Sequence, residues 1–304
     1  MGFWALCYRP MLRLGSAILV AAMLSAVGTQ QAPPPQQPQP NQVFRARVDT
    51  VAVYPLVSAP DGRLSTDLTR NDFVVLDNGK PAAIEVFSSD EQPTTAALML
   101  DMSASMDDRL VRVRDAASRL VDAIGPSDRL RIGTFGSEIS LSPWLTGDKQ
   151  LLARILREEL WPGGSTPLWN AIGAAMKSLA RETGRRTIVV VTDGVDTTGG
   201  TQVGVATRAT NELFMIYGVG MEGKGLSPAL VKLIAETGGG YFSLTRKDDL
   251  GAAFARLALE LRHQYLVGFV PNELDEKVHT LSVQVTHPGF TVRAPQQFLA
   301  SRAK

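Results

Sequence analysis

The chain carries two kinds of hydrophobic pattern. In residues 43–92 and 264–304, apolar side chains recur at every second position, as in the run HTLSVQV of the second region. Such alternation predicts strands with one buried face. Asn78 and Gly79 form a dipeptide that is typical of a two-residue hairpin turn. We therefore expect both regions to consist mainly of strands.

Residues 93–263 follow a different pattern, in which short continuous apolar runs alternate with helical periodicity. Apolar runs of this kind are typical of parallel strands that are buried on both faces. The predicted strands are AALMLD, RLRIGTF, RTIVVVTD, LFMIYGVG and GGYFSL, and the predicted helices lie near residues 109–124, 148–159, 167–182, 227–237 and 247–263. The fold class is therefore α/β, with a doubly wound, mostly parallel, Rossmann-like sheet.

The two flanking regions need each other to form a core. Neither region has enough strands to close a hydrophobic core by itself, and both show the same alternation. We expect residues 43–92, the N-terminal β segment, to pair with residues 264–304, the C-terminal β segment. Together they would form a small β-sandwich-like accessory region beside the α/β domain of residues 93–263.

The first 42 residues have the composition of an export signal and a spacer. Residues 1–28 contain Arg9 and Arg13, then an apolar stretch, then small residues at a plausible cleavage point. The apolar stretch of 14 residues is shorter than the roughly 20 that a membrane span needs, which favours a cleaved signal peptide. Residues 29–42, rich in proline and glutamine, predict an extended linker. We expect an exported protein, periplasmic or secreted to the cell surface, with membrane attachment only if the leader is retained as an anchor.

Charge and cysteine content narrow the possible partners. The formal net charge of +1 becomes −1 when Arg9 and Arg13 leave with the leader, so nucleic acid is an unexpected partner. The single cysteine, Cys7, precedes the apolar leader stretch. A mature chain would have neither a disulfide nor a thiol nucleophile.

Candidate chemistry lies where the predicted parallel strands end, because ligands of open α/β sheets bind at that end. DMSASM follows the first of these strands, GGSTPLWN lies in a later loop, and VTDGVD ends another strand. Two carboxylates and three hydroxyls can meet there, and hard oxygens suit Mg²⁺ or Mn²⁺. The candidate metal ligands are Asp101, Ser103, Ser105, Thr166 and Asp193.

These motifs resemble the metal-ion-dependent adhesion site of von Willebrand factor type A domains. The resemblance covers about residues 93–263 and implies a cation held by the five residues named above. Ala104 stands where the family usually has glycine. The flanking strands resemble those of a bacterial subgroup of exported proteins with related domains. The resemblance implies a non-enzymatic adhesion or protein-interaction module, in which an Asp or Glu carboxylate of a partner protein completes the coordination of the cation.

Each candidate ligand also has an ordinary structural interpretation. Ser105 and Thr166 are typical helix caps, and Asp193 precedes a glycine as turn residues do. Asp107 and Asp108 would complement the dipole of the next helix, or else hold a second cation. These alternatives remain open at the level of sequence.

An enzymatic function is the main alternative class. The segment GVGMEGKG, residues 218–225, resembles nucleotide-binding loops, but Gly225 stands where a phosphate loop has Ser or Thr. All three histidines lie in or beyond the last predicted helix, and no histidine-based catalytic triad is evident. The alternatives are a metal-dependent hydrolase or nucleotide-binding enzyme that uses the same pocket, and a structural envelope protein with a vestigial site.

Overall fold

The computed structural model describes residues 50–158, 163–221, 225–244 and 250–302. The predicted signal peptide and linker lie outside these ranges. So do residues 222–224 of the glycine-rich segment and the first residues, 247–249, of the last predicted helix. Across the described ranges, each helix is too short or too polar to cross a bilayer.

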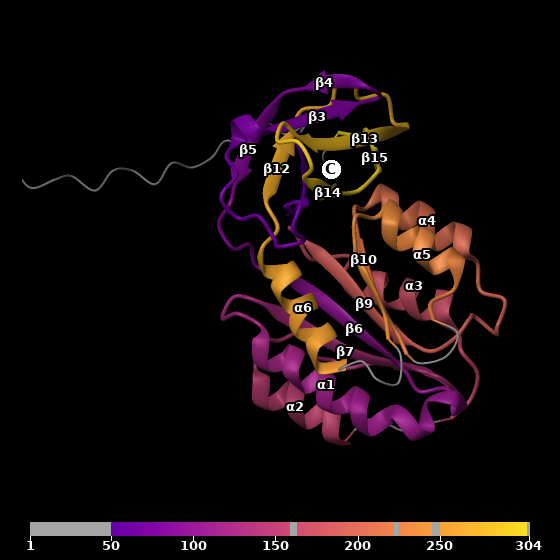
Figure 1. Ribbon diagram of the computed structural model, residues 1–304. Helices are drawn as coiled ribbons and strands as arrows, with labels where there is room; N and C mark the ends of the chain where they lie inside the picture. The colour runs from indigo at the N-terminus through magenta and orange to yellow at the C-terminus, as the bar shows by residue number, and fades with distance from the viewer. Residues whose placement is uncertain (1–49, 159–162, 222–224, 245–249, 303–304) are drawn as a thin grey trace, which may run out of the picture. The chain divides into compact units, whose positions relative to one another are not determined.

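The centre of the molecule is a six-stranded sheet (Figure 1). Its strand order is β11-β10-β9-β6-β7-β8, and every neighbouring pair is parallel except β7 and β8. The strands are β6 (Thr95–Asp101), β7 (Arg129–Phe135), β8 (Ile139–Leu141), β9 (Arg186–Thr192), β10 (Met215–Gly220) and β11 (Tyr241–Ser243). The predicted α/β fold with a mostly parallel sheet is confirmed.

Helices cover both faces of this sheet, which is why its strands are apolar on both sides. Side chains of α1 (Leu110–Ala123), α2 (Lys149–Glu158) and α6 (Leu250–Arg262) pack with Leu98 and Leu100 of β6. Side chains of α3 (Leu168–Ser178), α4 (Gln202–Asn211) and α5 (Pro228–Glu236) pack with the alternate residues Ala97 and Met99. The alternation along β6 thus divides the apolar residues between two cores.

Three features differ from the pattern-based expectation. Helix α4 was not predicted, because it buries only Val205 and Ala209, and its other residues are polar or small apart from the exposed Val203. The three-residue strand β8 is too short to show a period. Helix α3 ends at Ser178, before the predicted end near residue 182. At this end of the helix the Ser178 hydroxyl donates a hydrogen bond to the Ala175 carbonyl.

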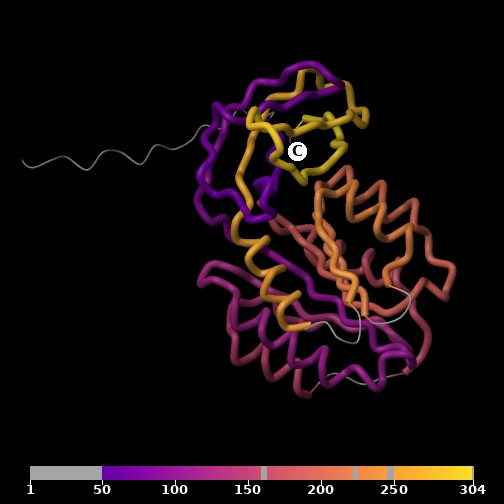
Figure 2. Tube along the Cα trace, viewed as in Figure 1, coloured from indigo at the N-terminus to yellow at the C-terminus, as the bar shows by residue number. Residues whose placement is uncertain are grey.

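Strands from both flanking regions share their sheets (Figure 2). One sheet has the order β1-β12-β5, a second has the order β15-β13-β3-β4, and β14 pairs with β2. Asn78 and Gly79, with φ of 49° and 77°, make the hairpin turn between β3 and β4, as predicted. The strands are β1 (Val51–Val53), β2 (Leu56–Ser58), β3 (Phe73–Asp77), β4 (Lys80–Ala82), β5 (Ile84–Ser88), β12 (Leu266–Phe269), β13 (Val278–Val285), β14 (Thr291–Arg293) and β15 (Gln297–Leu299), and a short 3-10 helix, η1 (Arg70–Asp72), precedes β3.

A buried arginine joins the two places where the chain passes between the strands of the flanks and the central sheet. Arg185 is 3% exposed. Its guanidinium donates to the Gln264 side chain at 2.7 Å, to the Gln92 carbonyl at 2.5 Å and to the Thr94 hydroxyl. Burial lowers the pKa of Arg185 to about 10. The Arg185 side chain therefore forms hydrogen bonds with both the connection before β6 and the connection after α6.

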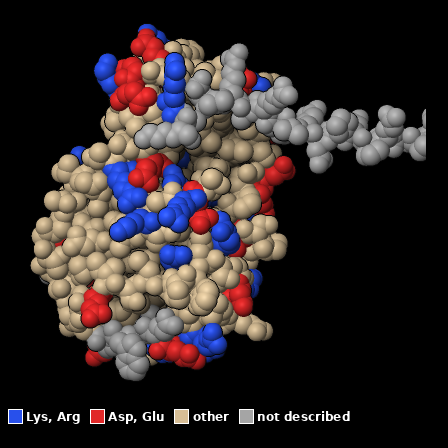
Figure 3. Space-filling model, turned by 180° about the vertical axis from the view of Figure 1, so that it is seen from behind, with Lys and Arg blue, Asp and Glu red and all other residues tan. Residues whose placement is uncertain are grey.

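The surface seen from behind carries mixed charge. On this face Lys and Arg side chains gather towards the middle, with Asp and Glu side chains among them (Figure 3). Ion pairs in the described part of the chain include Arg129 with Glu182 and Arg208 with Glu212. The face therefore does not present a field of one sign.

Candidate metal centre

The candidate site begins where β6 ends. Asp101 is the last residue of β6 and is completely buried. One oxygen of its carboxylate accepts the Ser103 N–H at 2.8 Å, and the other accepts the Thr192 hydroxyl at 2.5 Å. The chain then enters a short 3-10 helix, η2 (Ala104–Arg109). The carboxylate is thus held in a fixed position at the carboxyl end of the sheet.

Asp193 follows the neighbouring strand β9 and faces the same point. The Ser103 and Ser105 hydroxyls lie 3.2 Å apart, and the Ser105 hydroxyl donates to Asp193 Oδ1 at 2.9 Å. Because β6 and β9 are parallel neighbours, the residues that follow them lie next to each other at the same edge of the sheet. Hydrogen bonds therefore link Ser103, Ser105 and Asp193 beside the Asp101 carboxylate.

The Thr166 loop is fastened to the loops on both sides of it. Gly163 N–H donates to the Met102 carbonyl at 2.6 Å. The Thr197 N–H donates to the Thr166 carbonyl at 3.1 Å, and the Thr166 N–H donates to the Thr197 hydroxyl at 2.8 Å. Gly164 has φ of 88°, and a Cβ there would lie 2.4 Å from the Ser137 backbone nitrogen, so the close approach requires glycine. The Thr166 side chain is buried, but within the described ranges its hydroxyl has no hydrogen bond to the other four candidates.

The cap interpretations do not describe Ser105 and Thr166. Ser105 lies inside η2, and its hydroxyl bonds Asp193 and not a backbone N–H. Helix α3 begins after Pro167 with no side-chain cap. Asp107 and Asp108 lie in η2 with exposed side chains. Each hydroxyl is therefore available for a role other than capping.

The Asp101 carboxylate lies in an electrostatically unfavourable position. Burial raises the pKa of the Asp101 carboxyl, the hydrogen bonds from Ser103 and Thr192 lower it, and the negative charge of Asp193 raises it further. The net result is a pKa above the ordinary value of 3.8. Among the described residues no basic side chain pairs with Asp101. Two carboxylates are thus placed together with one of them lacking positive charge.

Several residues of the site were missed by sequence reasoning. Arg109 forms an ion pair with Asp193 and donates to the Ser105 carbonyl at 2.9 Å. Asp196 accepts the backbone N–H groups of Gly199 and Gly200 and so shapes the loop after β9. A basic residue four positions after Ser105 and a hydroxyl directly before Asp193, in Thr192, were the available signals.

The donor set fits one small, hard cation. All five candidate ligands supply oxygen, and Mg²⁺ and Mn²⁺ prefer oxygen ligands in octahedral geometry. In the described part of the chain there is no group of three or more His, Cys, Asp or Glu side chains suited to a metal. A site of this composition therefore depends on its hydroxyls as well as on Asp101 and Asp193.

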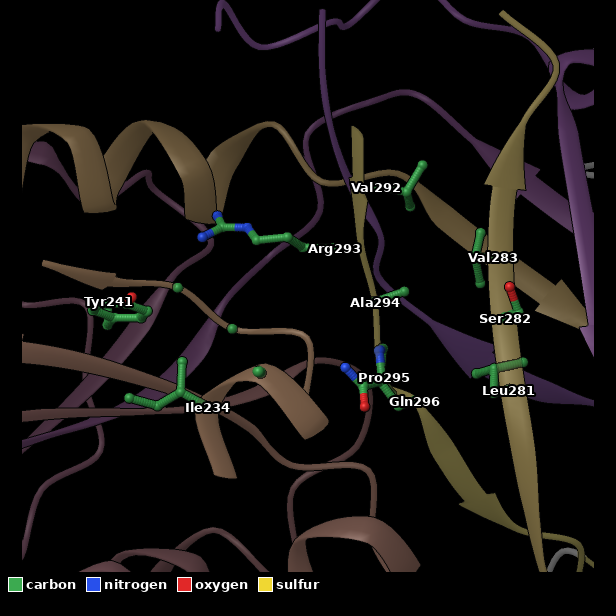
Figure 4. Close-up of a pocket in the computed structure, with 13 residues that line it drawn as sticks. Ile234, Tyr241, Leu281, Ser282, Val283, Val292, Arg293, Ala294, Pro295 and Gln296 are labelled. Carbon is green, nitrogen blue, oxygen red and sulfur yellow. The ribbon is translucent and has the colours of Figure 1, made fainter. Parts of the chain in front are cut away.

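A cavity lies away from these residues (Figure 4). It has a volume of about 360 Å³, and none of the five candidate ligands lines it. Ile234 and Tyr241 of the α/β part lie on one side, and Leu281 and Val283 of β13 lie on the other. Arg293 on its wall is already paired with Glu260. The cavity is therefore distinct from the carboxyl-end site.

Residues 96–195 match the family model of the von Willebrand factor type A domain. This range contains β7, β9, all of β6 except its first residue, and all five candidate ligands. The fold has the same architecture, with helices on both faces of a mostly parallel sheet. The chain therefore contains a von Willebrand factor type A domain, which the family model matches over residues 96–195.

Several solved structures are similar to this chain at low sequence identity. A von Willebrand factor type A protein from Catenulispora acidiphila is 12% identical, with a TM-score of 0.52, over 84% of this chain and 75% of that chain. Proximal thread matrix protein 1 from the mussel byssus, with a zinc-occupied MIDAS motif, is 15% identical with a TM-score of 0.50, over 60% of this chain and 48% of that chain. An aerotolerance-related membrane protein from Bacteroides fragilis is 23% identical with a TM-score of 0.46, over 56% of this chain and 98% of that chain. No curated protein matches the sequence.

Proposed function

We propose that this protein is an exported interaction module that binds a partner protein through one divalent cation, Mg²⁺ or Mn²⁺. The ligands would be the five residues Asp101, Ser103, Ser105, Thr166 and Asp193. The cation would supply an open coordination position for an Asp or Glu carboxylate of the partner. Adhesion or assembly at the cell surface or in the periplasm would be the biological setting.

The observation that carries this proposal is the environment of Asp101. A carboxylate that is buried away from water is destabilised unless it is paired with positive charge or fully hydrogen-bonded. Asp101 is completely buried, accepts hydrogen bonds from Ser103 and Thr192, and lies close enough to Asp193 for the charge of Asp193 to raise its pKa. A bound cation would supply the charge that the described chain does not give to Asp101.

The two carboxylates and the three hydroxyls would have different roles in binding the ion. Asp101 and Asp193 would give two negative charges, which balance a divalent ion and leave it able to attract a third carboxylate. The hydroxyls of Ser103, Ser105 and Thr166 would hold the ion without adding charge. The mussel protein, whose MIDAS motif holds zinc, supports divalent binding at such a site on this fold.

The positions of the histidines support a non-enzymatic interpretation. His279 contacts Asp77 and Asp275, and His287 contacts Asp72, all of them in the flanking strands or the segments next to them. Neither histidine bonds any of the five candidate ligands. A hydrolase using this pocket would need a general base within hydrogen-bond reach of the reacting water.

The proposal is tested with the full chain by isothermal titration calorimetry with MnCl₂ and MgCl₂. We expect one site per chain, lost in Asp193→Asn. An array of peptides in matched pairs, Asp against Asn and Glu against Gln, then tests recognition of a carboxylate. Binding to acidic members only, in Mn²⁺ and not in chelator, supports the proposal. Binding that persists in chelator would overturn it.

A further inference from the structure

The chain's own guanidinium occupies the site beside the candidate ligands. Arg109, the last residue of η2, forms an ion pair with Asp193 Oδ2, and its Nη1 also donates to the Ser105 carbonyl at 2.9 Å. The side chains of Arg109 and Asp193 are only 16% and 7% exposed. The other oxygen of Asp193 accepts the Ser105 hydroxyl. Both oxygens of Asp193 are therefore engaged by the chain itself.

The same guanidinium has a second carboxylate on its outer side. Arg109 Nε lies 3.7 Å from Asp108 Oδ1, and the Asp108 side chain is 74% exposed. That nitrogen is buried and has no hydrogen-bond partner among the described residues. Arg109 therefore lies between a buried carboxylate, Asp193, to which it donates a hydrogen bond, and an exposed carboxylate, Asp108, with which it forms a longer ion pair.

We propose that Arg109 is a resident cation that competes with the divalent ion for Asp193 and so sets the metal affinity of the site. This rests on the proposed function, because it takes Asp193 as a metal ligand. A guanidinium and a divalent ion at one shielded carboxylate repel each other strongly. Loading the site therefore requires the Arg109–Asp193 pair to open, and Asp108 receives the displaced guanidinium.

The competition has two consequences for the protein. Without metal, Arg109 neutralises one of the two adjacent carboxylates, so the empty site keeps its shape and the loops stay together. With metal, the Arg109 positive charge moves outward to the rim of the site. The residue at position 109 then sets the cation concentration at which the site becomes occupied.

The test uses the full chain with Arg109→Gln, which keeps a polar side chain of similar length and removes the charge. We expect Mn²⁺ and Mg²⁺ to bind about tenfold more tightly by calorimetry, because the competing cation is gone. The midpoint of thermal unfolding in chelator should fall, since Asp193 loses its partner, and it should recover in saturating metal. Arg109→Lys, which keeps a charge, should lie between wild type and Arg109→Gln, and it serves if Arg109→Gln does not fold. Arg112→Gln controls for the loss of one positive charge on the same segment.

The role of Asp108 is tested by a double-mutant cycle. Asp108→Asn should weaken metal binding about threefold in the wild type and have no effect in Arg109→Gln, because only a displaced guanidinium uses Asp108. Asp107→Asn, the neighbouring exposed acid, is the control for general charge and should change little. An equal effect of Asp108→Asn in both backgrounds would overturn the exchange between the two acceptors.

The outcomes separate this inference from the function beneath it. Equal or weaker metal binding by both Arg109→Gln and Arg109→Lys, with binding by the wild type intact, overturns the competition and leaves the proposed function standing. Metal binding by Arg109→Gln and not by the wild type supports the competition and overturns the proposed function, because the natural site would then hold no cation. Absence of binding in every folded variant overturns the proposed function and this inference together.

Discussion

Two buried carboxylates in this chain have opposite surroundings. Asp77, at the end of β3, is completely buried and accepts His279 Nδ1 at 2.6 Å and the Asn272 N–H at 2.8 Å. The other ring nitrogen of His279 lies 3.0 Å from Asp275 Oδ1. We call Asp77, Asp275 and His279 the histidine cluster. Asp101 is equally buried, but it faces a second carboxylate and has no basic partner among the described residues.

The difference separates a structural carboxylate from a candidate ligand. In the histidine cluster the chain supplies a basic side chain, His279, and so completes the interaction by itself. At Asp101 the chain supplies hydrogen bonds without charge, and Arg109 neutralises only Asp193. A buried acid that lacks positive charge in its own protein is a place where an external cation gains the most. Substitutions that remove one of these groups at a time test the difference between the two carboxylates.

The largest expected effect is the removal of Asp77. Asp77→Ala should lower the free energy of unfolding by about 3–5 kcal/mol, because it leaves a buried imidazole and the Asn272 N–H without their acceptor. Urea unfolding of the full chain measures this. A loss within experimental error of zero would show that the histidine cluster contributes no net stability.

The next effect is the pH dependence of the histidine cluster. Burial lowers the pKa of His279, but the hydrogen bonds to Asp77 and Asp275 outweigh it and leave the pKa above its ordinary value of 6.5. The folded chain therefore binds the proton more tightly than the unfolded chain. This contribution to stability is complete below pH 6.5 and is lost as the pH rises through the folded-state pKa.

Unfolding curves at a series of pH values check this contribution. His279→Gln should remove the part of the profile between pH 6.5 and the folded-state pKa, and it should be less destabilising than Asp77→Ala. Equal profiles for His279→Gln and the wild type would contradict the assignment.

At Asp101, removing the carboxylate charge should not lower the free energy of unfolding, in contrast to the loss expected at Asp77. In chelator, Asp101→Asn should leave the free energy of unfolding unchanged or raise it by about 1 kcal/mol, because it removes a buried charge next to Asp193 while keeping a side chain of the same size. Chemical denaturation of both proteins in chelator measures the difference. A loss comparable to that of Asp77→Ala would place Asp101 with the structural carboxylates.

The smallest effect is expected at Ala104, which stands between the two serines. Ala104→Gly should lower the free energy of unfolding by about 0.5–1 kcal/mol, since glycine loses more conformational freedom on folding. The side chain is exposed, and no candidate ligand is removed. Metal affinity measured by calorimetry should change less than about threefold, well below the tenfold expected for Arg109→Gln.

Much of the fold follows from local pattern. The continuous apolar runs of β6, β9 and β10 fixed the parallel sheet, because only strands covered on both faces can be apolar throughout. The exits of β6 and β9 then led to Asp101 and Asp193. Helix α4 and strand β8 were not predicted, because α4 buries few apolar residues and β8 is three residues long.

The partners within the site could not be read from the chain. Thr192 donates to Asp101, and Arg109 pairs with Asp193 across 84 positions, contacts that only the packed loops create. The histidine cluster likewise joins residues 202 positions apart. The limits of the β segments and of the α/β domain remain predictions, as do the metal ligands.

The most direct test of the account is thermal unfolding of the full chain and of Asp101→Ala, each in chelator and in millimolar Mg²⁺ or Mn²⁺. A cation that binds only the folded state should stabilise the wild type by about 2.7 kcal/mol at a hundred times its dissociation constant. The account predicts a raised midpoint for the wild type and none for Asp101→Ala. A wild-type midpoint that does not respond to either metal would contradict it.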